Sequence, residues 1–169
     1  MGIALLFISV LLFAYCMIFI ESSPAKHMWV TGSVLLLAVV SVTLILNDTN
    51  HFGMKQISKT QEQKLTSSVK SAGPEKLLYK KLGNGQEKIY YYRTKNDKDK
   101  KMKKTDPMTT KVRVKRSSAN KLKVVKNYWV YKNGWTKVFF AGGQPNHQFI
   151  DQHDTFLIDS DWQLVETKK

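Results

Sequence analysis

The sequence predicts a membrane helical hairpin followed by a small all-β domain. Two stretches without a single charged residue, 3–20 and 29–46, predict two transmembrane helices. The rest of the chain is rich in Tyr, Trp, Val, Ile, Phe and Thr, and its turn signals recur roughly every ten residues, which favours short strands over helices. We therefore expect a β meander, either barrel-like or a compact sandwich, anchored by two helices.

Both apolar stretches have the length that a bilayer requires. At about 1.5 Å rise per residue, each helix would cover roughly 27 Å, close to the hydrocarbon thickness of a membrane. The segment between them, ESSPAKHM, is short, polar and interrupted by Pro24, and we interpret it as a tight turn between antiparallel helices. Trp29 fits the aromatic belt at a membrane surface. The alternative, two core helices of a soluble domain, is disfavoured because soluble domains of this size rarely hold two charge-free helices.

The first apolar stretch lacks the pattern of a cleaved signal peptide. It has no basic segment before it and no small-x-small cleavage pattern, so we expect both stretches to be retained. The single cysteine, Cys16, lies inside this stretch, and one cysteine cannot build a disulfide framework. We expect Cys16 to be a buried apolar side chain.

Charge is distributed very unevenly along the chain. The net charge is +14, and residues 1–46 hold one basic and one acidic residue, so the whole excess lies in residues 47–169. For orientation, Lys26 between the two stretches and the lysines that follow the second stretch give opposing signals. The cysteine-free body, rich in Lys, Thr, Asn and Tyr, resembles an exported domain, so we expect a cell-membrane protein whose C-terminal domain is extracytoplasmic.

We divide the chain into three parts: the two helices in residues 1–46, a polar linker with one weak strand at most in residues 47–74, and a basic all-β domain in residues 75–169. The expected strands of that domain are 76–82, 87–94, 111–116, 121–132, 135–140, 155–158 and 162–165. Asn133-Gly134 is a strong hairpin signal, because both central residues of a type I′ turn need a positive φ. It therefore predicts that strands 121–132 and 135–140 pair.

A lysine-rich segment and the strand that follows it form the first candidate site. Alternation in KVRVKR places Val112 and Val114 inward and the basic side chains outward. The candidate polyanion-contacting residues are Lys98, Lys100, Lys101, Lys103, Lys104, Lys111, Arg113, Lys115 and Arg116. Such a patch attracts phosphate-bearing polymers and anionic lipid headgroups. The alternative is a solvated loop whose charges only aid solubility, because Asp97, Asp99 and Asp106 dilute the field.

Aromatic residues supply the second candidate site. Trp129, Tyr131 and Trp135 form a candidate exposed aromatic surface that could stack on bases or sugar rings or dock on a partner. The alternative, which we favour for the aromatic cluster as a whole, is that these rings complete a thin β core. The consensus of RNA-recognition strands is absent, so nucleic acid is disfavoured as a partner.

No catalytic or metal site is expected. The stretch NHQFIDQHD (146–154) holds metal-ligand types in His147, Asp151, His153 and Asp154, but its spacing matches no zinc signature and we interpret it as a polar loop. Nucleophile-elbow, phosphate-loop and C-x-x-C motifs are missing from the sequence. We therefore expect no enzyme activity and no cofactor.

Four segments resemble a family of small membrane proteins from lactobacilli and related lactic-acid bacteria, which is classed as a domain of unknown function. They are NHFGMK (50–55), KLLYKKLGNGQEKIYYY (76–92), WVYKNGW (129–135) and NHQF (146–149). The resemblance covers most of the chain but depends on the composition of these segments and their order along the chain, not on a chemical motif. It implies two membrane helices and one β-rich domain, and it brings no activity or functional residue.

These observations lead to one expected function and two alternatives. We expect a non-catalytic, membrane-anchored module of the cell envelope that contacts a polyanion, such as an anionic lipid or an envelope polymer, or a neighbouring membrane protein. One alternative is an accessory subunit of a membrane efflux transporter, because Gly32, Ser33, Ser41 and Thr43 offer small packing contacts. The other is a nucleic-acid-binding module facing the cytoplasm. The first expected partner is the lipid bilayer. Further candidate partners are an anionic lipid or envelope polymer and a membrane transporter.

Overall fold

The computed structural model of the chain describes residues 1–69, 73–83, 85–95 and 101–167. The chain divides into two compact units. The first, called here the helical unit, comprises Met1–Ile57 and Trp129–Gln148. The second, called the sheet unit, comprises Ser58–Tyr128 and Phe149–Lys169.

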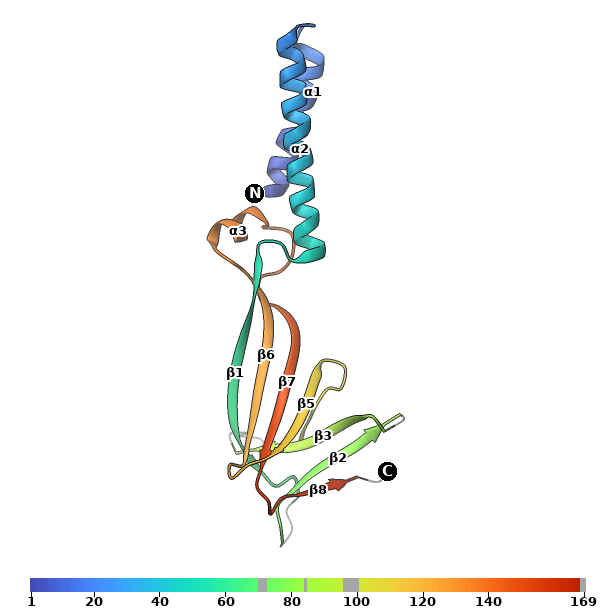
Figure 1. Cartoon of the computed structure of the whole chain (residues 1–169), viewed down its shortest axis with the longest axis vertical. Coiled ribbons are helices and arrows are strands. Elements are labelled where there is room, and N and C mark those ends of the chain that lie inside the picture. Colours follow the sequence, from blue (N-terminus) through green and yellow to red (C-terminus); the bar gives the residue numbers. More distant parts are fainter. Residues whose placement is uncertain (70–72, 84, 96–100, 168–169) are drawn as a thin grey trace. The chain divides into compact units, whose positions relative to one another are not determined.

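Two long apolar helices dominate the helical unit, as the sequence predicts. α1 (Gly2–Phe19) and α2 (Pro24–Asn50) lie side by side and run in opposite directions (Figure 1). Each is long and apolar enough to cross a membrane, and only 17% of the apolar window of α1 and 11% of that of α2 are buried. A core helix of a soluble protein would be mostly buried, so these exposed surfaces fit contact with lipid.

Small residues are frequent among the buried positions of the two helices. The buried positions recur every seven residues: Gly2, Ser9 and Cys16 on α1, and Ser33, Val40 and Asn47 on α2. A spacing of seven returns to the same side of a helix, and small side chains let two membrane helices approach closely. The buried hydroxyls of Ser9 and Ser33 each donate to a carbonyl one turn earlier. Ser33, one of the small residues that the sequence offers to a transporter, thus serves this helix pair, whereas Gly32 is exposed.

The turn between the helices is shorter than the sequence predicts. α2 begins at Pro24 and not near Trp29, because the Ser23 side chain accepts a hydrogen bond from the Lys26 backbone N–H and caps the helix. Proline is well placed in a first helical turn, where its missing N–H would have no partner in any case. At its other end α2 extends to Asn50 and stops at His51, whose φ of 55° lies in the left-handed region.

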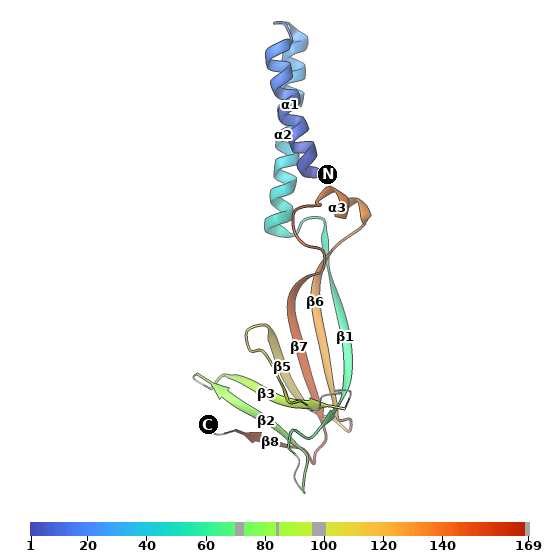
Figure 2. The ribbon, with the colours of Figure 1, turned by 180° about the vertical axis from the view of Figure 1, so that it is seen from behind.

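The β domain is built on one mixed, curled sheet, which confirms the predicted class of two helices plus a small β domain. The strands are β1 (Met54–Thr66), β2 (Lys76–Leu82), β3 (Glu87–Thr94), β4 (Lys103–Lys104), β5 (Thr110–Arg116), β6 (Lys121–Tyr131), β7 (Gln148–Ile158) and β8 (Gln163–Glu166). Their order is β5-β7-β6-β1-β3-β2-β8, with β4 paired to β3. The pairs β5–β7 and β2–β8 are parallel, so the connections go beyond a simple meander. Figure 2 shows β2, β3 and β8 running crosswise to β5, β6 and β7.

A long strand occupies the segment that the sequence suggests is a polar linker. β1 covers Met54–Thr66 and lies between β6 and β3 in the sheet. Most of its side chains are exposed, and only Met54 and Leu65 are buried. The strand is therefore held mainly by backbone pairing with its neighbours, which leaves little hydrophobic pattern to detect in the sequence.

The predicted strand 135–140 is wrong, because this segment forms the short helix α3 (Gly134–Phe139). Asn133 takes an extended backbone with φ −153°, not a turn conformation, and its side chain accepts from the backbone N–H of Thr136. The Thr136 hydroxyl in turn accepts from the Asn133 backbone N–H, which completes a capping box. Asn133 thus starts a helix where the Asn-Gly pair predicts a hairpin.

The interpretation of residues 146–154 as a polar loop is also wrong. Residues 148–154 belong to β7, which pairs in parallel with β5 over seven residues, from Thr110–Gln152 to Arg116–Ile158. The polar side chains of this strand are partly exposed except for the buried Asp154, so its composition resembles a loop although its backbone is paired in the sheet.

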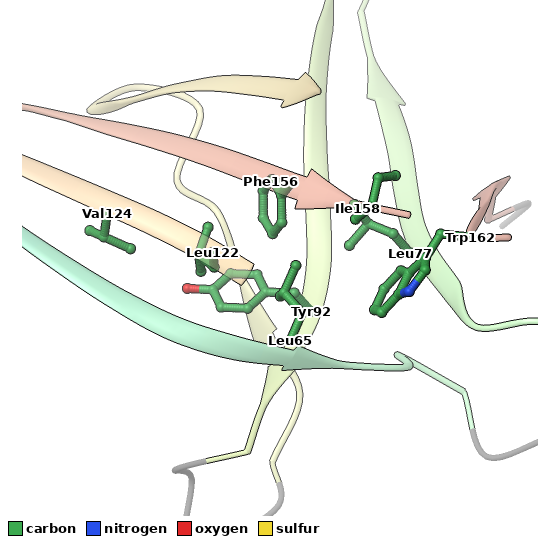
Figure 3. Packing of buried hydrophobic residues seen from close by; sticks show 8 residues of the cluster. All are labelled: Leu65, Leu77, Tyr92, Leu122, Val124, Phe156, Ile158 and Trp162. Atoms are coloured by element: carbon green, nitrogen blue, oxygen red, sulfur yellow. The ribbon is translucent and has the colours of Figure 1, made fainter. Parts of the chain in front are cut away.

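The core of the sheet unit lies inside the curl of the sheet. Its buried residues are Leu65, Leu77, Tyr92, Leu122, Val124, Phe156, Ile158 and Trp162. Figure 3 shows most of these side chains gathered between strands that cross, with Trp162 just before β8. Tyr92 meets Phe156 edge to face, with ring centroids 5.4 Å apart. Aromatic rings thus complete the core, as the favoured interpretation of the aromatic cluster expects.

Candidate functional site

Three basic side chains stand in a row on β5. Val112 and Val114 pack against the core of the sheet unit, and Lys111, Arg113 and Lys115 are exposed. The predicted alternation of this strand is therefore confirmed. β5 ends the strand order of the sheet, so the side chains of this basic row (Lys111, Arg113 and Lys115) stand on an edge strand. Among the described residues, an ion pair to an acidic side chain forms at Lys111 but not at the other two.

The lysine-rich segment is only partly a loop. Lys98 and Lys100 lie outside the described residues, and Lys101 is exposed. Lys103 and Lys104 form β4, which pairs with Tyr92 and Tyr91 of β3. β4 thus continues the sheet on the β3 side, whereas β5 lies beyond β7. The curl brings strands β3 and β5 to the walls of one hollow of about 340 Å³, which Lys88, Tyr90 and Val112 help to line.

Arg116 has a structural role that the sequence does not reveal. Its Nη1 donates to the backbone carbonyls of Asp159 at 2.6 Å and Trp162 at 2.8 Å, with a longer contact to Ser160 at 3.4 Å. The guanidinium thereby closes the loop between β7 and β8. These bonds use Nη1, one of the three guanidinium nitrogens, and Arg116 is exposed, so it stays a candidate polyanion contact in addition to this structural role.

A carboxylate with several partners lies beside the basic row. Asp151 Oδ1 accepts from Asn127 Nδ2 at 2.6 Å, while Oδ2 lies 3.0 Å from His153 Nε2 and 4.0 Å from Lys111 Nζ. The hydrogen bond from Asn127, followed by the contacts with His153 and Lys111, lowers the pKa of Asp151 against a smaller opposing effect of burial. Asp151 partly neutralises Lys111. In the described part of the chain, no third residue of metal-ligand type joins Asp151 and His153.

Asp154, three residues further along β7, has the opposite environment. Its side chain is 1% exposed, and Oδ1 accepts from Gln152 Nε2 at 2.8 Å. Oδ2 has no hydrogen-bond partner among the described residues. Burial raises the pKa of Asp154 and outweighs the hydrogen bond from Gln152 and the nearby positive charge of Lys126. The pKa values of the two carboxyl groups on β7 are therefore shifted in opposite directions. Asp151 has hydrogen-bonding and charged partners near the surface, whereas Asp154 is buried with too few partners.

The candidate aromatic surface lies in the helical unit and is not uniformly exposed. Tyr131 is 8% exposed, which corrects its assignment to an exposed surface. Its hydroxyl donates to the Gln144 carbonyl at 2.7 Å, and its ring stacks on Phe140. Trp129 stacks on His51 with ring centroids 4.5 Å apart. Both rings therefore pack where α2 ends, because β6 finishes beside that helix terminus.

Of the three residues in the candidate aromatic surface, Trp135 is the exposed one. It lies on α3 and is 85% exposed, and Val138 on the same helix is 46% exposed. α3 stands where the sequence predicts a strand, although the sequence also holds a signal for a helix. Asn133 followed by a threonine three positions later is a helix-start pattern, and Trp135, Val138 and Phe139 have the i, i+3, i+4 spacing of one helical face.

Comparison with known proteins places the chain in a family. Neither the curated proteins nor the solved structures contain a match to it. A family profile described as Domain of unknown function (DUF4811) matches residues 22–169. The matched range includes α2, α3 and every strand of the described sheet. Because this range covers most of the 169 residues, the chain belongs to the DUF4811 family.

Proposed function

We propose that the protein is a non-catalytic, membrane-anchored module of the cell envelope that contacts phosphate-bearing polyanions through the basic row of β5. The observation that carries this proposal is the row itself: three cationic side chains on an edge strand, held in place because the intervening valines are packed in the core. An edge strand leaves one side of its backbone open, so a long polymer can approach without displacing another strand.

The surrounding charge supports this choice of ligand. The sheet unit holds 23 Lys and Arg against 11 Asp and Glu, a net charge of +12, whereas the helical unit has a net charge of +2. Such an excess raises the local concentration of anions and speeds their association in a salt-dependent way. Phosphodiester groups are the shared chemistry of envelope polymers and anionic lipid headgroups, and the cationic side chains can bind either of them.

An extracytoplasmic position of the sheet unit belongs to this proposal. The only cysteine, Cys16, lies in α1, so the sheet unit needs no reducing compartment. The two-span hairpin returns the chain to the side on which it starts. The large basic domain does not conflict with export, because charges in long domains have little influence on orientation.

The proposal is tested on the full chain in nanodiscs of zwitterionic lipid. Two probes are offered separately: vesicles containing phosphatidylglycerol, and soluble long-chain polyphosphate. Each basic side chain near an anionic membrane contributes about 1 kcal/mol. Because Asp151 already compensates part of the Lys111 charge, replacing Lys111, Arg113 and Lys115 by Gln should weaken vesicle binding by about 2–3 kcal/mol, or roughly 30- to 150-fold, and should flatten its salt dependence.

The matched control removes the same charge elsewhere in the sheet unit. Lys59, Lys64 and Lys95 are exposed on β1 and just after β3, so their replacement by Gln lowers the net charge equally. The proposal predicts a much smaller loss for this control. Equal losses in the two variants would show that only the overall charge matters, and absence of salt-sensitive binding to both probes would refute the proposal. Binding to one probe only identifies the source of the phosphate.

Sidedness is tested in intact cells with a membrane-impermeant maleimide. In a Cys16→Ser background, a Lys123→Cys variant places one thiol at an exposed position of the sheet unit. Labelling before lysis supports the extracytoplasmic position. Labelling only after lysis excludes it and favours the cytoplasmic nucleic-acid-binding alternative. Position 123 is preferable to one near Asn133, because Asn133 caps α3 close to the helix ends.

A further inference from the structure

α3 exposes an apolar face that has no explanation within the protein. Trp135 and Val138 are 85% and 46% exposed, and they lie three residues apart, on one side of the helix. Phe139, four residues after Trp135, is partly buried on the same side. The intervening Lys137 lies about 200° away from Trp135 around the helix axis and is exposed. α3 is thus a short amphipathic helix whose apolar face is largely uncovered.

The contacts of α3 place it at the end of the two apolar helices. The terminal amino group of Met1 donates to the Val138 carbonyl at 2.9 Å. A Cβ added to Gly2 would lie 2.8 Å from the Phe139 carbonyl oxygen and 3.0 Å from the Leu44 side chain, so these three residues meet closely. Figures 1 and 2 both show α3 beside the N-terminus of α1. If α1 and α2 cross a membrane, α3 lies at the level where the hydrocarbon ends.

An apolar hollow lies beside this face. Its volume is about 310 Å³, and it is lined by Thr43, Phe52, Trp135, Thr136, Phe139 and Phe140. The hollow therefore begins on the lipid-facing part of α2 and continues onto α3. Its volume is at the lower end of the roughly 300–1,000 Å³ of small-molecule sites. Phe52, on its wall, is itself 53% exposed.

We propose that α3 is an interfacial membrane contact and that this hollow holds part of an acyl chain of a phospholipid in the adjacent leaflet. Tryptophan is favoured at the headgroup level, where its ring meets apolar chains and its N–H meets water. Lys132, exposed two residues before the start of α3, can contact the phosphate of the same lipid. Lipid is the expected occupant because the hollow is continuous with the surface of α2. Thr43 of α2 lines the hollow, and Leu44 of α2 lies beside Gly2 and Phe139.

This site differs from the basic row of β5 in residues and in chemistry. The basic row attracts phosphate by charge alone, so its binding weakens with salt. The α3 site buries apolar surface, and an interfacial helix typically lies about 5–10 Å into the boundary of headgroups and acyl chains. Its occupancy should therefore persist in high salt and in zwitterionic lipid.

The test places an environment-sensitive fluorophore on single cysteines of the full chain in bilayers, in a Cys16→Ser background. Trp135→Cys and Val138→Cys report the apolar face, so a folding defect in one variant does not remove the test. Lys137→Cys reports the opposite side of the same helix, and Lys123→Cys the sheet unit. Each sample is quenched by lipid brominated near the glycerol end of its acyl chain and, separately, by aqueous iodide.

The proposal predicts blue-shifted emission at positions 135 and 138, loss of that emission with brominated lipid, and little loss with iodide. Position 123 should show the reverse pattern, and position 137 should be quenched by iodide more strongly than position 135. Iodide quenching at 135 and 138 equal to that at 123 would overturn the proposal. Protection from both quenchers would overturn it as well, because it would mean that a protein surface, such as a second copy of the chain, covers this face.

Discussion

The buried carboxyl group of Asp154 predicts the direction in which the free energy of unfolding changes with pH. Asp154→Asn keeps the shape of the side chain and an acceptor for Gln152, but removes the charge. The pKa of Asp154 is raised in the folded protein because the group is buried. Between the ordinary pKa of an aspartate and this raised value, the folded state binds more protons than the unfolded state. The free energy of unfolding of the natural protein therefore falls as pH rises through this window.

The variant does not carry this penalty, so its advantage should appear with rising pH. Below the ordinary pKa of an aspartate the two proteins should be similarly stable, because both side chains are then neutral. At neutral pH the natural protein carries the desolvation cost of a buried charge, about 1–3 kcal/mol, which the neutral amide avoids. In a unit of this size, 1 kcal/mol corresponds to about 4–8 °C in Tm. Asp154→Asn should thus raise the Tm of the sheet unit at neutral pH, and by less in acid.

The assay is thermal and urea unfolding of the full chain in detergent at a series of pH values, in a background where Trp162 is the only tryptophan. Trp162 is 2% exposed in the core of the sheet unit, so its fluorescence reports the loss of that core. Asp151→Asn is the matched control on the same strand. The pKa of Asp151 is lowered by its partners, so its stabilisation is present above the ordinary pKa and is lost as pH falls through the lowered one.

The two variants should therefore move in opposite directions at neutral pH, with Asp151→Asn destabilised by less than about 1 kcal/mol because the side chain is partly exposed. The reasoning is refuted if Asp154→Asn lowers stability at neutral pH, or if its difference from the natural protein does not change with pH. A shift of equal sign for both variants would show that the buried carboxyl group has a partner that compensates its charge.

Three further predictions concern single contacts. Asn133→Ala removes the cap of α3 and should cost about 1 kcal/mol of helix stability, seen as faster hydrogen exchange in residues 134–139, whereas Asn133→Ser should retain most of the protection. Arg116→Gln removes donors to the Asp159 and Trp162 carbonyls and should speed exchange in the loop between β7 and β8; unchanged exchange would show that the clamp is dispensable. Gly53→Ala should be strongly destabilising in a thermal melt, because Gly53 has φ +81° and an added Cβ would lie 2.7 Å from the Phe140 ring.

Elements with their own hydrophobic pattern could be predicted from the sequence. The two helices, the hairpin of β2 and β3, and β5 each show their signal over consecutive residues. In β5 the inward direction of Val112 and Val114 also follows from alternation, so the sequence alone predicts the basic row. The alternation of apolar and polar side chains is a local property of the sequence, so it can be detected without knowing the partner strand.

Elements held by distant partners could not be predicted in this way. β1 buries only two of its side chains and depends on pairing with β6 and β3. The role of Arg116 depends on carbonyls more than forty residues away. Tyr131 alternates like a surface residue, yet its hydroxyl finds the Gln144 carbonyl and its ring finds Phe140. In each case the deciding contact joins segments whose proximity is created by the fold.

The segment around Asn133 shows how one local signal can support two structures. Asn-Gly favours a tight hairpin, but asparagine is also among the best helix caps. The helical alternative places Phe140 against Tyr131 and Met54 in a buried cluster, whereas a strand would send alternate side chains to opposite sides. Burial of this cluster therefore favours the helix, and as a consequence Trp135 is left exposed. The exposed ring lies at the end of two apolar helices, where lipid rather than water can cover it, so the same choice that stabilises the helical unit creates its proposed lipid contact.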